Sequence, residues 1–196
     1  MLKTRNLKIA AAVLLTQMSL IVVGQSERYA GRTITGTAYF FGGRTRVPSR
    51  PFRLLVNRYT SQQEVNELNS ALQSGGQDDL LKVLSKMDAG RIEVGTGVGV
   101  IANAIIASEN EGRTKLTVLY QRRLGFGELR YGTRSTDYKF GYAELYVGRG
   151  VDEGMLIPAA RVRLQNGNTW EVEDFGTYPA RLMGLKVRGG GKEDVR

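Results

Sequence analysis

The chain has 196 residues, and it contains neither Cys nor His. This length is enough for one domain with a hydrophobic core that needs no disulfide. The two missing residue types exclude disulfides, zinc–thiolate sites and a nucleophile of the Cys or Ser–His kind. We therefore predict no metal site and no cofactor, and the composition favours a non-catalytic protein over an enzyme.

The formal net charge of +9 arises from 28 Lys and Arg against 19 Asp and Glu. Three of the positive charges, Lys3, Arg5 and Lys8, lie at the start of the chain, and the others are spread among acids. This distribution favours long-range attraction to anionic surfaces, but it does not predict a specific nucleic-acid site.

Residues 1–24 have the layout of a secretory signal peptide. A basic start is followed by an apolar run over residues 9–23 and then by the small or polar Gly24, Gln25 and Ser26. The run is short for a membrane-spanning helix, which needs roughly 20 apolar residues. We therefore predict an exported protein, periplasmic or extracellular, that contacts a membrane only through this segment. The alternative is a signal that stays uncleaved, because the stretch before Gly24 is a weak cleavage site.

The rest of the chain is predicted to form one β-rich domain over residues 25–188. Its first strands are expected over residues 33–41, where apolar and polar residues alternate, and over residues 52–59. The glycine-rich and charged residues 189–196 are typical of a disordered tail.

The hydrophobic period becomes helical over residues 61–88. Ser61 and Glu64 have the spacing of a capping box at a helix start. Gly75 and Gly76 are predicted to end this helix, and a second helix follows. We therefore predict a helical hairpin that is inserted between strands and covers one end of a sheet.

Strand patterns resume after the helices. Further strands are predicted over residues 91–95, 98–108, 114–121 and 138–147, and short turns connect most of them. Together these segments predict a mainly β (α+β) fold, an antiparallel β-barrel or sandwich of about eight strands with the helical hairpin inserted.

The register of one hairpin can be predicted from its side chains. A two-residue turn at Asn166-Gly167 would set Arg163 opposite Trp170 and mix apolar with charged faces. A three-residue loop over residues 166–168 instead matches every cross-strand pair. The predicted pairs are Leu164 with Trp170, Val162 with Val172, Arg163 with Glu171, and Arg161 with Glu173. Another strand is expected over residues 180–188.

Short motifs in this chain resemble an uncharacterised family of exported bacterial proteins. They are Met87-Asp88-Ala89-Gly90-Arg91-Ile92, Arg134-Ser135-Thr136-Asp137-Tyr138 with Glu144-Leu145 after it, and the stretch over residues 171–182. The resemblance covers most of the chain after the predicted signal. It implies an exported single domain, and it carries over no functional residue.

A glycine-rich stretch, Gly95-Thr96-Gly97-Val98-Gly99, begins like a phosphate-binding loop. The position of the third glycine of a dinucleotide fingerprint is Val100, however, and no Walker lysine follows. We therefore interpret these glycines as places where a strand bends or packs closely.

An aromatic row with one acid forms the first part of a candidate ligand site. Tyr138, Phe140, Tyr142 and Tyr146 alternate along one predicted strand, and Glu144 shares their face. Such a row suits either core packing or the wall of an apolar pocket. Glu144 is either an acid in apolar surroundings, as a carboxylate hydrolase requires together with a second acid, or a rim residue paired with arginine.

Arginines around the loop over residues 125–137 form the second part of this candidate site. They are Arg122, Arg123, Arg130 and Arg134. They suit an anionic polymer, a phospholipid headgroup or an acidic partner, and the alternative is a solvated basic surface. We take Arg122, Arg130 and Arg134, together with the aromatic row and Glu144, as the candidate ligand-binding residues.

These observations leave three hypotheses for function. In the first, an exported non-catalytic β-barrel holds a small apolar or amphipathic ligand, with the aromatic row as its wall and the arginines at its mouth. In the second, the interior is filled and a basic outer surface docks an envelope protein or an anionic polymer. In the third, the chain is a carboxylate-based hydrolase that uses Glu144.

Overall fold

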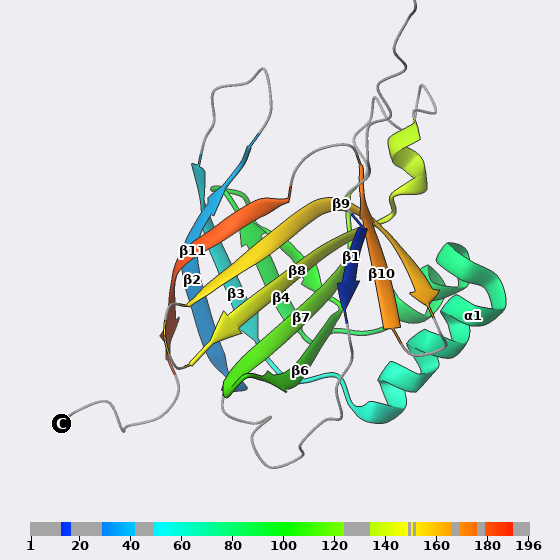
Figure 1. Cartoon of the computed structure of the whole chain (residues 1–196), viewed down its shortest axis with the longest axis horizontal. Helices are drawn as coiled ribbons and strands as arrows, with labels where there is room; N and C mark the ends of the chain where they lie inside the picture. The colour runs from blue at the N-terminus through cyan, green and yellow to red at the C-terminus, as the bar shows by residue number, and fades with distance from the viewer. Residues whose placement is uncertain are drawn as a thin grey trace, which may run out of the picture.

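Figure 1 shows a computed structural model of the chain, in which a strongly curved antiparallel sheet lies beside a helix. The structure describes residues 13–16, 29–41, 49–123, 134–148, 150, 152–165, 169–175 and 179–189.

The described part of the chain contains eleven strands. The first strands are β1 (Val13–Thr16), β2 (Arg32–Tyr39) and β3 (Ser49–Val56), and they precede the helix α1 (Gln62–Leu84). The next are β4 (Gly90–Val94), β5 (Val100–Ala102), β6 (Ala104–Asn110) and β7 (Arg113–Gln121). A short 3-10 helix, η2 (Arg134–Asp137), leads to β8 (Phe140–Val147), β9 (Glu153–Gln165), β10 (Thr169–Asp174) and β11 (Ala180–Arg188).

The mainly β prediction is confirmed, but the prediction of a closed barrel or a two-sheet sandwich is wrong. Strands β2 to β11 form one antiparallel sheet, whose main path runs β5-β4-β3-β2-β11-β9-β8-β7-β6. Strand β10 pairs with β9 outside this path, and β1 pairs with β10. The hydrogen-bonded path therefore ends at β5 and β6 and does not close.

The two ends of the path are consecutive in the chain and meet at Asn103. The chain pairs with β4 up to Ala102 and with β7 from Ala104 onward. At the corner the Asn103 side chain donates to the carbonyl oxygen of Met87 at 3.0 Å and accepts from the backbone N–H of Gln121 at 2.9 Å. The Asn103 side-chain amide thus takes the place of backbone hydrogen bonds between strands at the point where the chain changes its partner from β4 to β7. Because of this change of partner, the backbone hydrogen bonds of the sheet do not continue from β5 to β6.

The predicted helical hairpin is also wrong, because α1 is a single kinked helix. Its start is as predicted: the Ser61 hydroxyl accepts from the Glu64 N–H at 3.3 Å, and Glu64 accepts from the Ser61 N–H at 2.8 Å. Gly76 has φ 62° and ψ −139°, a conformation that glycine adopts at little cost. The glycine therefore kinks the helix where the sequence predicted that it would end.

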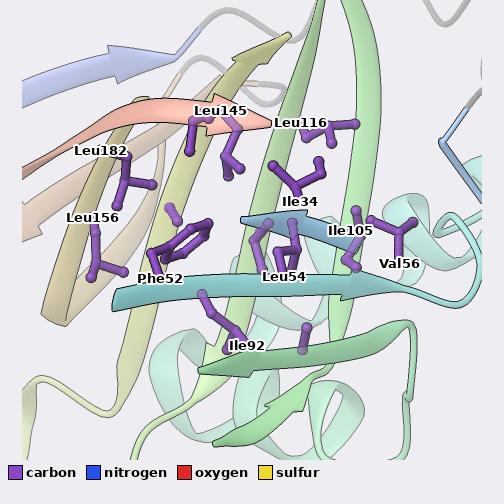
Figure 2. Packing of buried hydrophobic residues seen from close by; sticks show 14 of the residues in the cluster. Ile34, Phe52, Leu54, Val56, Ile92, Ile105, Leu116, Leu145, Leu156 and Leu182 are labelled. Carbon is purple, nitrogen blue, oxygen red and sulfur yellow. The ribbon is translucent and has the colours of Figure 1, made fainter. Parts of the chain in front are cut away.

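Large apolar side chains occupy the inner side of the curved sheet. Figure 2 shows Ile34, Phe52, Leu54, Ile92 and Leu116 gathered between strands from opposite sides of the curve. Each of these side chains is at most 2% exposed. Burial of such side chains is worth roughly 1.5–3 kcal/mol each, so this cluster is the main source of stability of the sheet.

A second apolar cluster joins α1 to the other side of the sheet, which we call the α1 face. The helix contributes Val65, Leu68, Leu72, Leu80 and Leu84. The sheet contributes, among others, Phe140, Tyr142, Val162, Trp170 and Val172. Trp170 also donates its indole N–H to Asn69 Oδ1 at 2.7 Å, which ties β10 to the helix. In the region where α1 packs on the sheet, both sides of the sheet are therefore apolar.

The predicted hairpin register is confirmed. Strand β10 pairs with β9 so that Trp170 lies opposite Leu164, Val172 opposite Val162, Glu171 opposite Arg163, and Glu173 opposite Arg161. The loop residues 166–168 lie outside the described residues. The strand predicted over residues 180–188 is β11.

The ends of the chain are described only in part. Within the predicted signal peptide, residues 13–16 form β1, and the rest of residues 1–24 lie outside the described residues. Of the predicted tail, Gly189 is described and residues 190–196 are not. Among the helices that the structure describes, none combines the length and the apolarity that a membrane crossing requires.

Candidate functional site

The predicted aromatic row does not form one surface. Phe140 and Tyr142 are fully buried under α1, whereas Tyr146 is only half-buried. Tyr138 precedes β8 and turns toward β10, where its ring packs edge-on against Phe175 with centroids 5.0 Å apart. Its hydroxyl donates to Glu173 Oε1 at 2.7 Å. Only Tyr142 and Tyr146 of the row are brought together, and Glu144 joins them.

Glu144 is buried on the α1 face and is surrounded by donors. Its carboxylate lies 2.7 Å from Lys115 Nζ, accepts from the Tyr146 hydroxyl at 3.1 Å, and also accepts from the Tyr142 hydroxyl. The Glu144 residue is 2% exposed and Lys115 is 8% exposed. We call these four residues, Lys115, Tyr142, Glu144 and Tyr146, the Glu144 cluster. A buried charge of this kind is tolerated because it is paired and hydrogen-bonded.

Strand pairing explains why the cluster forms. The register of β7 and β8 sets Lys115 opposite Tyr146 and Thr117 opposite Glu144, so Lys115 reaches the carboxylate diagonally. The Arg113 guanidinium lies 5.2 Å from the centroid of the Tyr146 ring. Burial, followed by the charge of Glu144, raises the pKa of Tyr146 to about 12. Tyr146 therefore stays protonated and keeps donating to Glu144 throughout the neutral range.

The structure also contains an open cleft of about 670 Å³ beside the Asn103 corner. We call it the basic cleft. Its apolar wall consists of Leu81 from α1 with Val100 and Ile101 from β5. Ile101 is 44% exposed, and isoleucine is usually buried. Its strand stops pairing with β4 one residue later, at Ala102. The change of partner at Asn103 thus creates an accessible apolar surface.

Three cations border the same cleft: Arg122, Arg123 and Lys139. Arg122 is held in place by its Nε, which donates to the carbonyl oxygen of Tyr138, and Lys139 pairs with Asp78 of α1. Arg123 is exposed, and no acid of the described residues pairs with it. Arginine beside an open apolar wall is well suited to carboxylate, sulfonate or phosphate groups.

The candidate arginines are therefore placed unequally. Arg122 and its neighbour Arg123 line the basic cleft. Arg134 begins η2, but its side chain lies outside the description, and Arg130 lies outside the described residues. Arg122 and the Glu144 cluster do not form one site, since no residue of the Glu144 cluster lines the basic cleft.

Lys115 and the apolar wall of the cleft were missed by reasoning from sequence. Lys115 lies on the opposite face of its strand from Leu116, and its partner Glu144 lies across a long connection. A polar Asn103 between apolar strand residues was the available signal for the corner. Among the described residues, no three acids gather in a way that would hold a metal ion.

No protein-family model, curated protein or solved structure matches this chain. The resemblance to exported bacterial proteins therefore stays a prediction.

Proposed function

We propose that the chain is an exported, non-catalytic binding protein whose basic cleft holds a small amphipathic anion. The observation that carries this proposal is the meeting of an apolar wall, Leu81, Val100 and Ile101, with the cations Arg122, Arg123 and Lys139. An apolar ligand body would lie along the wall, and its acidic group would meet the arginines.

The size and position of the cleft support this proposal. Its volume of about 670 Å³ is within the range of roughly 300–1,000 Å³ that small-molecule sites have. The inner side of the sheet is a less suitable place, because Phe52, Leu54 and their neighbours are already packed against one another there. We therefore propose the ligand site at the outer corner beside α1, and not in the interior, where the sequence suggested it.

The Glu144 cluster supports a structural role better than hydrolysis. A general acid must reach the substrate, yet Glu144 is 2% exposed and already bound by Lys115, Tyr142 and Tyr146. A carboxylate-based hydrolase is therefore the weakest of the three hypotheses. Docking of an anionic polymer remains the alternative that the exposed Arg123 favours.

Binding of decanoate tests the proposal. We expect isothermal titration to detect decanoate binding and to find decanol at least about tenfold weaker, because it lacks the charge that arginine recognises. The variant Arg122→Gln with Arg123→Gln should weaken decanoate binding by about tenfold or more. The variant Lys186→Gln with Arg188→Gln is the matched control, since it removes two exposed positive charges on β11, away from the cleft.

Equal affinity for decanoate and decanol would contradict recognition of the anion. Binding of heparin but not of decanoate, with the same loss in the double variant, would favour the polymer alternative. Export is tested separately by the intact mass of the protein purified from its own cells. We expect the mass of a chain that has lost about its first 24 residues, as signal cleavage requires.

A further inference from the structure

The outer edge of β10 is occupied by a strand from the start of the chain. Strand β1 pairs antiparallel with it, so that Val13 lies opposite Glu173, Leu14 opposite Val172, Leu15 opposite Glu171, and Thr16 opposite Trp170. The other edge of β10 pairs with β9. Figure 1 shows β1 lying directly beside β10. Without β1, the backbone N–H and C=O groups along this edge would lack strand partners.

Strand β10 is held firmly whether or not β1 is present. Trp170 and Val172 are 1% and 0% exposed, and both belong to the cluster that packs on α1. The indole N–H of Trp170 bonds to Asn69, and Glu173 is held by Arg163 at 3.2 Å and by the Tyr138 hydroxyl. An edge fixed on a packed strand is a ready template for an added strand.

We infer that the β10 edge is a strand-acceptor site, which binds an extended, proline-free segment with an apolar residue at the position opposite Val172. The chain's own Val13–Thr16 occupies this site in the structure. The inference rests in part on the proposed export, because residues 13–16 lie within the predicted signal peptide. Cleavage of that signal would vacate the edge and leave it to a strand of a partner protein.

The charges of β10 argue against a second copy of this chain as the occupant. Two β10 strands that paired antiparallel with their α1 faces on the same side would set Glu171 or Glu173 of one copy opposite Glu171 or Glu173 of the other. With those faces on opposite sides, the same glutamates would lie opposite Trp170 and Val172. Like charges directly opposite each other destabilise a sheet. A partner strand such as Val-Leu-Leu-Thr avoids this repulsion, as β1 does at the register positions opposite both glutamates.

The site can be tested on the full chain with the variant Leu14→Pro and Leu15→Pro. Successive N–H groups of a strand point to opposite edges, so replacing both residues removes at least one donor toward β10. The probe is a fluorescein-labelled peptide with the sequence of residues 11–18. We expect the double-proline variant to bind it at least about tenfold more tightly than the unsubstituted chain does, because a tethered strand competes at an effective concentration of roughly millimolar.

Trp170 is a built-in reporter, because it is the single tryptophan of the chain and lies opposite Thr16. Its emission should change when the peptide binds to the double-proline variant. A peptide that carries the same two prolines is the control and should not bind. Binding of both peptides alike, or of neither, would overturn the inference. If the double-proline variant dimerised and the dimer did not bind the peptide, the inference would also be overturned, because a second copy of the chain would then occupy the β10 edge.

Hydrogen exchange on the unsubstituted chain keeps the inference testable if the variant does not fold. We expect slow exchange for the β10 amides on the β1 edge as well as for those on the β9 edge. Fast exchange confined to the β1 edge would contradict the site. A chain found uncleaved in its own cells would contradict signal cleavage, and with it the vacated edge, but would leave this result intact, since both experiments use the full chain.

Discussion

Lys115 and Arg123 carry the same charge, but the fold treats them in opposite ways. Lys115 is 8% exposed, and its ammonium is 2.7 Å from the Glu144 carboxylate, which also accepts from two tyrosine hydroxyls. Arg123 is exposed at the basic cleft and pairs with no acid of the described residues. The charges of the Glu144 cluster are thus paired within the protein, whereas Arg123 of the cleft faces solvent.

This difference separates a charge that we expect to stabilise the fold from one that we propose for binding. Removing a member of the Glu144 cluster leaves a buried polar group without its partner, so the effect should appear in stability. Removing the exposed Arg123 of the cleft leaves no buried group without its partner, so the effect should appear in binding. Four predictions, from the largest expected change in stability to the smallest, test this separation.

The largest effect is expected for Lys115→Met, which keeps the length of the side chain and removes its charge. The Glu144 carboxylate would stay buried without its cation, a change that typically costs about 3–5 kcal/mol. Urea unfolding followed by circular dichroism measures this loss. Adding Glu144→Gln to the same chain should recover part of the stability, because no buried charge then remains. A loss below about 1 kcal/mol, the range of exposed ion pairs, would break the comparison.

A smaller loss is expected for Tyr146→Phe, which removes the hydroxyl that donates to Glu144. A hydrogen bond to a charged group contributes about 1.5–3 kcal/mol. Because burial raises the pKa of Tyr146 from 10.0 to about 12, its contribution is complete below pH 10 and is lost as the pH rises to about 12. Unfolding free energies at pH 8 and pH 11.5 should therefore differ less in Tyr146→Phe than in the parent. Equal pH dependence would place Tyr146 outside the cluster.

Glu64→Gln tests a pair between the two extremes, in which Glu64 is half-buried and Arg58 is exposed. Glu64 accepts from Arg58 and closes the capping box of α1, and the bond from Arg58 is the main reason why its pKa falls to about 2. Gln can still accept from the Ser61 N–H, so the variant removes mainly the charged pair with Arg58 and should cost about 0.2–1 kcal/mol at pH 7. The depressed pKa means that the contribution is present above about pH 4.5 and is lost as the pH falls to about 2.

The measurement for Glu64 is thermal unfolding of parent and variant at pH 7 and pH 2.5. Their difference in stability should shrink at the lower pH. Glu67→Gln is the matched control, because Glu67 is exposed on the same helix. A similar loss in both variants would show that the Arg58–Glu64 pair contributes nothing specific.

The smallest effect on stability is expected for Arg123→Gln. An exposed residue away from such features usually changes stability by less than about 0.5 kcal/mol. The same variant should still weaken decanoate binding, since its guanidinium borders the cleft. A clear loss of stability in urea unfolding, with decanoate binding unchanged, would reverse the roles that we assign to the two regions.

The sequence was most informative where neighbouring segments of the chain pair with each other. The register of β9 and β10 was predictable because both charged and apolar pairs agree on one alignment, as Arg163 with Glu171 and Val162 with Val172 do. The capping box at Ser61 was predictable for the same local reason.

The sequence was least informative where a local signal has two structural outcomes. Gly76 with positive φ can end a helix or kink it, and the packing of Leu80 and Leu84 onto the α1 face favours the kink. Asn103 likewise interrupts a run of apolar residues, and it separates β5 from β6. The predicted barrel failed at this residue, because one strand divides its pairing between β4 and β7.

The candidate site was predictable only in parts. Glu144 was identified as an acid among apolar residues, but its partner Lys115 depends on the register of β7 and β8, which are joined by a long connection. Arg122 was identified from the cluster of arginines. The apolar wall opposite it comes from α1 and β5, and no local pattern relates those segments to Gln121–Arg123 of the sequence.

The most direct test of the basic cleft is a map of chemical-shift changes on isotope-labelled protein titrated with decanoate. We predict that the largest changes fall on Ser85, Ile101, Gln121 and Arg123, which border the cleft. The interior residues Ile34 and Leu54 should change little. Large changes at Ile34 and Leu54 with none at the cleft would contradict the account and return the ligand to the inside of the sheet.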